Sequence, residues 1–166
     1  MEKREFNALI SKINKSERAF ETLYDFYYKR IVYRLSRSYG RELAEDVAHE
    51  FFLNLIKSDK PVKEVDSPAA WIYACCENLA KTKIRKERET PIGEFYEGNP
   101  AENFTDGMNA DVKAALSSLD EISRKIVYMH YWEGYGFEEI SEILGVSYAA
   151  VRQKHKRLKA ALKNIL

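Results

Sequence analysis

The chain has 166 residues, 45% of them hydrophobic, which is enough apolar material for a packed core and excludes a globally disordered protein. Its formal net charge is only +1, which excludes a generic polyanion binder, so any affinity for nucleic acid must come from an uneven distribution of charge. No apolar run approaches the length of a membrane span, and the N-terminus, MEKREF, has no signal-peptide core, so we expect a cytoplasmic protein without membrane insertion.

The only two cysteines, Cys75 and Cys76, are adjacent in the sequence. Neighbouring cysteines cannot easily form a disulfide with each other. A zinc site that combines them with histidines would need ligand spacings that match no known pattern. We therefore expect small buried thiols on a helix, with no metal and no cofactor.

Apolar residues recur at helical spacing through the first part of the chain and predict an all-α fold. A short helix is expected over residues 2–13, a long one over residues 16–39 and a third over residues 42–57. Ser16 is suited to cap the second helix and Gly40 to end it. The third helix turns its polar side chains outward: Glu45, Asp46, His49, Glu50 and Asn54.

Residues 57–67, KSDKPVKEVDS, are polar and contain a proline, so we expect a loop. Ser67 and Pro68 then predict a helix start, because a capping hydroxyl precedes a proline at the first helical position. This helix runs to about residue 88 and ends in a cluster of cations: Lys81, Lys83, Arg85, Lys86 and Arg88. Cations favour the negative end of the helix dipole, but five in eight residues exceed that requirement, so a surface that faces phosphates explains them equally well.

Residues 90–110 differ in character from the segments on either side. They contain prolines, glycines and acidic residues, with no Lys or Arg. A segment of this length without a periodic pattern predicts a linker. The chain is therefore expected to hold two small helical domains, residues 1–89 and 111–166, joined by an acidic flexible linker.

The second domain ends in the layout of a helix-turn-helix unit. Asp120 is suited to cap one helix, which ends at Gly134, and two further helices follow within residues 136–166. Gly145 supplies the turn between them and Ser147 the cap of the second. That second helix carries cations and no acid: Arg152, Lys154, Lys156, Arg157, Lys159 and Lys163. DNA phosphates are the natural partner of such a surface.

Two separated motifs can be read together. The first is AEDVAHEFFLNLI at residues 44–56, followed by AAWIYACCENLAKTKIRK at residues 69–86. The second is LDEISRKIVYMHYWEGYGFEEISEILGVSYAAVRQKHKRLKAAL at residues 119–162. In this order, the two motifs resemble the bacterial extracytoplasmic-function (ECF) sigma factors of the sigma-70 family. The resemblance implies that residues 1–89 dock on the clamp helices of the largest RNA polymerase subunit and read and melt the -10 element. It implies that residues 111–166 read the -35 element as duplex, near the polymerase flap, and that the linker passes through the RNA exit path.

The resemblance also assigns roles to individual residues. Polymerase docking falls to Asp46, His49 and Glu50, although the family usually has Gln at the position of His49. Contact with the -10 element and strand opening fall to Asn78, Lys81, Lys83 and Arg85. Reading of the -35 duplex falls to Tyr148, Arg152, Gln153, Lys156 and Arg157, since Arg and Gln suit bidentate contact with guanine and adenine edges.

One loop and four further residues complete these expectations. The loop at residues 57–67 resembles the family loop that captures a flipped -10 base. Trp71 holds a core position of the family, so packing between helices is favoured over stacking on DNA. Lys154 and Lys159 flank the reading face and are expected to meet phosphates, whereas His155 falls on the apolar side and is expected to pack there half-buried.

Three classes of function compete for this sequence. A sigma factor would bind core polymerase and promoter DNA, and the family implies an anti-sigma factor as a further partner. A stand-alone helix-turn-helix regulator would use the N-terminal domain for sensing or dimerisation and would need no polymerase. An enzyme is not expected, because the sequence has no glycine-rich phosphate loop, no metalloprotease motif and no paired acids beside a cleft.

Overall fold

The computed structural model describes residues 1–88 and 110–163, and every regular element in these two ranges is a helix. The predicted all-α fold class is therefore confirmed. By its contacts the chain divides into two compact units, Met1–Pro100 and Ala101–Leu166. The predicted linker, residues 90–110, lies outside the described residues except for Ala110, which begins a helix. Within the described ranges, none of the helices combines the length and the apolar character needed to cross a bilayer.

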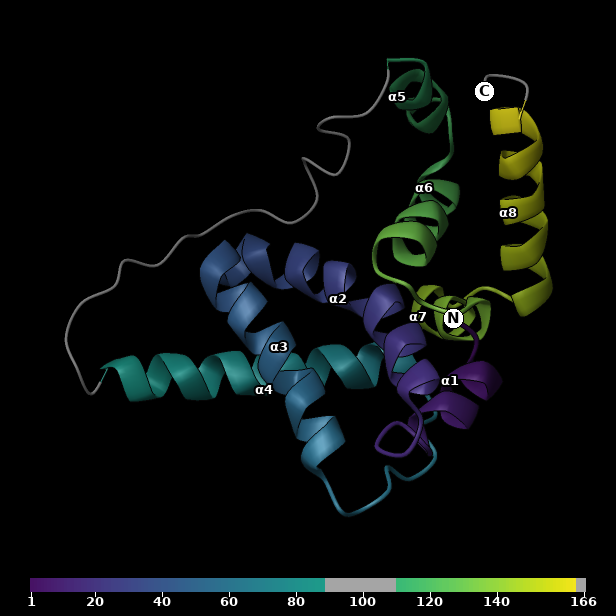
Figure 1. The fold of residues 1–166 in the computed structure, drawn as a ribbon. Helices are drawn as coiled ribbons and strands as arrows, with labels where there is room; N and C mark the ends of the chain where they lie inside the picture. The colour runs from purple at the N-terminus through teal and green to yellow at the C-terminus, as the bar shows by residue number, and fades with distance from the viewer. Residues whose placement is uncertain (89–109, 164–166) are drawn as a thin grey trace. The chain divides into compact units, whose positions relative to one another are not determined.

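The first unit is built from four helices: α1 (Lys3–Ile10), α2 (Glu17–Tyr39), α3 (Arg41–Lys57) and α4 (Pro68–Arg88). Helix α2 packs against the other three, and α3 also packs against α4 (Figure 1). The core holds the apolar residues that recur at helical spacing, together with the predicted buried thiol: Phe6, Ile10, Leu23, Tyr27, Ile31, Leu35, Val47, Phe51, Ile72, Tyr73 and Cys76. Burial raises the pKa of the Cys76 thiol, so this group is a packing element.

The ends of α2 lie where the sequence predicts them. The Ser16 hydroxyl accepts a hydrogen bond from the Ala19 amide at 3.2 Å, which satisfies one free donor of the first turn. Gly40 is the single residue between α2 and α3. Its φ of +81° is a backbone conformation that is unfavourable for residues other than glycine. Because the break is so short, α3 folds back directly against α2.

The second unit contains α5 (Ala110–Ser117), α6 (Glu121–Val127), the π-helix η1 (Tyr128–Trp132), α7 (Phe137–Leu144) and α8 (Tyr148–Lys163). Its core includes Leu116, Val127 and Leu158, with Val112, Leu119 and Trp132 packed around them. Helices α5, α6 and α7 each contact α8, so the last helix packs against three other helices of this unit.

One predicted element differs in shape. The sequence predicts a single helix from Asp120 to Gly134, but after Val127 the chain continues as the π-helix η1. The Glu133 amide bonds to the Tyr128 carbonyl five residues back, at 3.3 Å. A π turn adds a residue to the helix and shifts the side chains that follow it around the axis. Apolar spacing alone cannot reveal such a shift, because it depends on how the aromatic side chains pack.

The turn between α7 and α8 confirms the predicted helix-turn-helix unit. Gly145 has φ +64° and ψ 30°, the left-handed conformation that ends α7. The Ser147 hydroxyl accepts from the Ala150 amide at 3.2 Å and caps α8. At the start of α7, where Gly136 has no side chain to offer, the buried Glu139 carboxylate accepts from the Gly136 amide at 3.0 Å.

Asp120 joins two helices of the second unit. Its carboxylate accepts from the Ser123 amide at 2.9 Å, the predicted cap of α6, and also from the Ser123 hydroxyl at 2.7 Å. The Lys154 ammonium on α8 lies 3.0 Å from the same carboxylate. The sequence suggested that Lys154 meets phosphates, but in the structure its ammonium pairs with Asp120 at the surface of the same unit.

Replacing Asp120 with Ala should lower the midpoint of thermal unfolding, because it removes both the cap of α6 and the ion pair to α8. Hydrogen bonds from Ser123 and Lys154 hold the pKa of Asp120 below its usual value, so its stabilising effect is complete above the unfolded-state pKa and disappears as pH falls through the folded-state pKa. Calorimetry of the full chain should therefore show a larger effect at about pH 7 than at about pH 3. Glu121→Ala is the control, since Glu121 pairs with Lys125 within α6 and does not cap that helix. An equal effect of the two substitutions would contradict this role of Asp120.

Candidate nucleic-acid and polymerase interfaces

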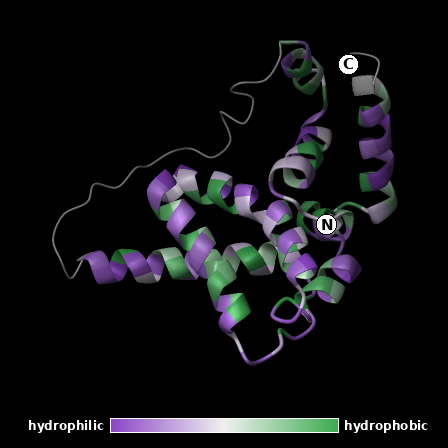
Figure 2. Cartoon of the chain, viewed as in Figure 1, coloured by the Kyte–Doolittle hydropathy of each residue, from purple (hydrophilic) through white to green (hydrophobic). Residues whose placement is uncertain are grey.

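The predicted -35 reading residues lie on one solvent-facing side of α8. Val151 and Leu158 are buried against the rest of the unit, which fixes the opposite face outward. The five predicted residues are all exposed: Tyr148, Arg152, Gln153, Lys156 and Arg157. The Arg152 guanidinium lies 5.7 Å from the centre of the Tyr148 ring, an aromatic contact that limits its freedom. Figure 2 shows α8 as a largely hydrophilic helix.

Two other residues of α8, Lys159 and His155, differ in their exposure to solvent. Lys159 is exposed beside the reading face, as expected of a phosphate contact. His155 is half-buried and contacts rings on η1 and α7, which confirms its predicted packing role. The structure therefore brings the predicted reading residues together and separates them from both Lys154 and His155.

The last turns of α4 present three of the four predicted -10 residues to solvent. Asn78, Lys81 and Arg85 are exposed, and Figure 2 shows that this end of the helix is largely hydrophilic. The Thr82 hydroxyl donates to the Asn78 carbonyl at 2.8 Å, so its proton is engaged within the helix. Lys83 behaves differently, because it turns toward α3.

Lys83 connects the predicted -10 surface to the predicted docking surface. Its ammonium lies 2.7 Å from the Glu50 carboxylate and 3.5 Å from that of Asp46. The hydrogen bond to Glu50 raises the pKa of Lys83, while burial opposes the increase. Two of the three predicted docking residues thus pair with one cation of α4, which partly neutralises their charge in the free protein.

The docking face of α3 continues beyond its charged residues. His49 is exposed and its ring lies 4.9 Å from that of Tyr28 on α2. Leu53 and Ile56 follow at the next turns and are 49% and 40% exposed, so this face of α3 presents two aliphatic side chains to solvent. Neither residue belongs to the docking set predicted from the sequence. The spacing 46, 49, 53, 56 could have found them, since it continues one face of the helix.

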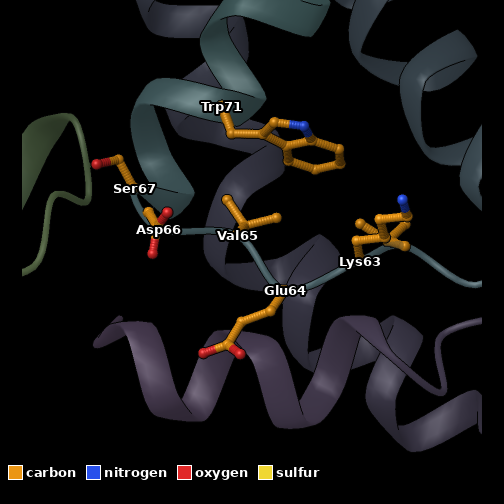
Figure 3. A pocket seen from close by; sticks show the side chains of 7 residues that line it. Lys63, Glu64, Val65, Asp66, Ser67 and Trp71 are labelled. Carbon is orange, nitrogen blue, oxygen red and sulfur yellow. The ribbon is translucent and has the colours of Figure 1, made fainter.

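The predicted base-capture loop borders a shallow hollow of about 380 Å³ in front of α4. Its lining comes from the loop and from Trp71, and Figure 3 shows the Trp71 ring lying over Val65 while Glu64 points away from it. The ring is half-buried, with Phe6 and Phe51 at 6.2 and 6.0 Å. Trp71 therefore packs between helices, as favoured, and also forms one wall of the hollow.

Asn7, which the sequence analysis did not single out, holds this loop in place. Its side-chain amide donates to the Val65 carbonyl and its oxygen accepts from the Val65 amide, both at 2.9 Å. The Lys3 ammonium pairs with Asp66 at 2.7 Å. No local pattern could reveal Asn7, because its partner lies 58 residues away in the chain.

Replacing Asn7 with Ala should destabilise the chain by about 1–2 kcal/mol, because two half-buried hydrogen bonds to the loop backbone are lost. It should also speed hydrogen exchange at the Val65 amide, which then has no side-chain acceptor. Exchange measured by NMR or mass spectrometry, with urea unfolding, tests both effects. Asn14→Ala is the control, since Asn14 donates an exposed hydrogen bond to the Ser58 carbonyl. Unchanged hydrogen exchange at the Val65 amide in Asn7→Ala would show that other contacts hold the loop.

Two family models match the chain in the order expected from its motifs. The model for sigma-70 region 2 matches residues 23–90, and the model for sigma-70 region 4 matches residues 110–162. Together they cover more than half of the sequence. The chain belongs to the sigma-70 family, in its ECF branch. The resemblance found from the sequence is thus confirmed, and the interfaces above lie within the two matched regions.

Curated relatives carry names of the same family. A probable RNA polymerase sigma factor, RfaY, of Xanthomonas campestris pv. campestris is 30% identical over 137 residues, which cover 74% of this chain and 34% of the relative. The ECF RNA polymerase sigma factor SigE of Mycolicibacterium smegmatis is 30% identical over 147 residues, 82% of this chain and 56% of the relative. The ECF RNA polymerase sigma-E factor of Haemophilus influenzae is 22% identical over 95% of this chain and 93% of its own length. The chain thus spans about a third and just over half of the first two relatives. Sigma factors as a family are non-catalytic initiation factors.

Proposed function

We propose that this ECF sigma-family chain directs core RNA polymerase to specific promoters and assists the opening of promoter DNA. The observation that carries the proposal is the presence of two separate surfaces suited to DNA, on α4 of the region 2 match and on α8 of the region 4 match. Each surface alone is small and carries few cations. Specific binding then depends on a polymerase that presents both surfaces to one promoter.

Reading of the -35 element is assigned to α8. The exposed Arg152 and Gln153 can form paired hydrogen bonds with guanine and adenine in the major groove. Lys156 and Arg157 flank them and supply further contacts to bases or phosphates, and Tyr148 holds the Arg152 side chain. The buried Val151 and Leu158 support this proposal, because they leave only one face of α8 to meet the groove.

Opening at the -10 element is assigned to α4 and the loop before it. Asn78, Lys81 and Arg85 would contact the backbone and bases of the separated strand. Extruding a base from a duplex costs a few kcal/mol, and contacts in a pocket can offset that cost. The hollow between residues 62–67 and Trp71 supplies such a place, with an aromatic wall on which a base can stack.

Docking on core polymerase is assigned to the exposed face of α3. Asp46 and Glu50 require a partner with cations, whereas Leu53 and Ile56 require apolar side chains in the same partner. His49 is exposed on the same face and can hydrogen-bond to that partner. A pair of polymerase clamp helices with basic and aliphatic residues meets both requirements. The flap is the proposed second polymerase contact, near the region 4 unit. An anti-sigma factor is the proposed regulatory partner, and the site of action is the cytoplasm, where polymerase works.

The alternative, a stand-alone helix-turn-helix regulator, would use the first unit for sensing or dimerisation. It is disfavoured by the region 2 match over residues 23–90, which a regulator of that kind does not need. The two proposals differ in whether polymerase is required. In vitro transcription of a genomic library with core polymerase, followed by mapping of start sites, should yield shared -35 and -10 elements. Specific promoter binding by the chain alone, with no transcripts from the holoenzyme, would favour the regulator.

Arg152→Ala should weaken promoter binding by the holoenzyme by about 1–3 kcal/mol if the contact with a base is bidentate, and should relax selectivity at one -35 position. Binding to promoters with each base at that element measures both effects. Lys159→Ala is the matched control, since a lost phosphate contact weakens all sequences alike. Equal selectivity in Arg152→Ala and the wild type would remove Arg152 from the reading set.

Replacing Asp46 and Glu50 together with Lys should weaken association with core polymerase, because it reverses the charge of the docking face. Competition against a labelled reference sigma factor measures the association. Lys83→Ala is the control, since it breaks the same two ion pairs while leaving the acidic face in place. If Lys83→Ala weakens association as much as the double substitution, the loss reflects the ion pairs and not the docking charge.

A further inference from the structure

Four rings meet where η1 and α7 face α8 in the second unit. The His155 ring of α8 lies 5.2 Å from His130, 5.6 Å from Tyr131 and 4.9 Å from Phe137, measured between ring centres. The His130 and Phe137 rings stack on each other at 4.4 Å. These contacts lie among η1, α7 and α8, apart from the exposed side chains assigned above to reading the -35 element.

One hydrogen bond in the cluster joins the π-helix directly to the last helix. The Tyr131 hydroxyl and the Nε2 atom of His155 are 2.9 Å apart. Tyr131 is 45% exposed, so its ring is not held there by burial, and the hydrogen bond gives it a defined position. His130, in turn, donates from Nδ1 to the Tyr135 carbonyl at 3.0 Å, which fixes its ring beside the pair.

His155 lies close to the predicted reading residues along α8, so its hydrogen bond to Tyr131 can affect how those residues are oriented. Arg152 lies one turn before His155, and Lys156 is the next residue, so two reading residues share the same stretch of helix. A rotation of α8 about its axis would move both side chains relative to a DNA groove. Val151 and Leu158 resist that rotation by apolar packing, which is not directional. A hydrogen bond with defined geometry resists it more selectively.

We propose that Tyr131 is a positioning residue for the -35 element: through its hydrogen bond to His155 it sets the rotation of α8 and thereby the aim of Arg152 and Lys156. This inference rests on the proposed function of α8. The Tyr131–His155 hydrogen bond should affect selectivity between base sequences more than total affinity for DNA. Bidentate base contacts depend on exact orientation, whereas the attraction between cations and phosphates acts over a longer range.

The protonation state of His155 should modulate the same contact. Burial lowers the pKa of His155, and the His130 ring of η1 and Lys159 of α8 lower it further. The remaining neighbours in the cluster are the Tyr131 hydroxyl and the uncharged Phe137. At neutral pH the ring is uncharged, and with its proton on Nδ1 its Nε2 atom accepts from Tyr131.

The direction of the pH effect follows from this lowered pKa. The stabilisation from the neutral ring is complete above the unfolded-state pKa and is lost as pH falls through the folded-state pKa. Protonation removes the acceptor at Nε2 and adds a positive charge near DNA. Total affinity for DNA should therefore hold or rise in mild acid, while selectivity for the cognate -35 element falls.

The test uses holoenzyme reconstituted from the full chain and core polymerase. Binding is measured to a cognate promoter and to the same promoter with a scrambled -35 element, and the ratio of the two affinities is the readout. Tyr131→Phe should lower this ratio about three- to tenfold, the range expected for one hydrogen bond. Tyr128→Phe is the matched control, because it removes a hydroxyl from the same π-helix and leaves the Tyr131 bond in place.

His155→Gln separates positioning from charge. The Gln amide can keep a hydrogen bond with Tyr131 but cannot titrate, so the ratio should stay near the wild-type value and lose its decline in mild acid. A ratio unchanged by Tyr131→Phe overturns the inference. An equal loss on both promoters also overturns it, because that result indicates a general loss of folded protein.

A measurement without polymerase separates this inference from the proposed function. Tyr131→Phe removes a donor to the neutral ring and should raise the pKa of His155, measured by NMR titration of the full chain. If the wild-type holoenzyme shows no promoter selectivity, the proposed function fails. A raised pKa of His155 in Tyr131→Phe would still establish the contact between the two side chains. An unaltered titration shows that the contact does not exist in solution, and the positioning role is then excluded.

Discussion

Burial of one apolar face on each helix is the constraint on which the rest of this protein depends. In the second unit, Val151 and Leu158 commit one side of α8 to the core, so the side that carries Arg152 and Gln153 must face solvent. In the first unit, Val47 and Phe51 do the same for α3 and leave the acidic face outside. The surfaces available for DNA and polymerase are therefore consequences of how the cores are packed.

The charged residues outside the cores do not act as independent sets. Lys83 bridges to Asp46 and Glu50, so the predicted DNA-opening and docking surfaces share an electrostatic network in the free protein. Exposed ion pairs of this kind contribute about 0–1 kcal/mol, which is small enough for a partner to replace them. Under the proposed function, a polymerase that engages the two acids would release Lys83 of α4 for contact with DNA. The proposal therefore links polymerase docking to promoter contact through these ion pairs.

The second unit uses polar contacts of a different kind. Asp120 connects the start of α6 to Lys154, and Tyr131 connects η1 to His155, so two bonds reach α8 from two other elements. Lys154 and His155 are sequence neighbours of the exposed residues of α8, but their side chains contact other elements of the unit. The same helix thus keeps some polar side chains exposed and uses others to hold its own position. Which residues do which cannot be read from residue type, since Lys154 and Lys156 are both lysines.

Several helix ends of this protein can be predicted from short stretches of its sequence. Ser16, Asp120 and Ser147 cap helices, and Gly40 and Gly145 end them, because each of these roles depends on atoms a few residues away in the chain. The paired motifs also identified the family, since their order and spacing are properties of the sequence itself.

Contacts between distant residues required the tertiary structure. Asn7 meets Val65, Lys154 meets Asp120, and Tyr131 meets His155, each across a long separation in the chain. The π turn at Tyr128–Trp132 and the exposure of Leu53 also depend on how neighbouring helices pack. Local patterns in the sequence were enough to indicate most of the helices, several of their ends and the family. The polar side chains that hold the fold could be told from those that stay exposed only in the folded chain, because long-range packing sets the direction of each helical face.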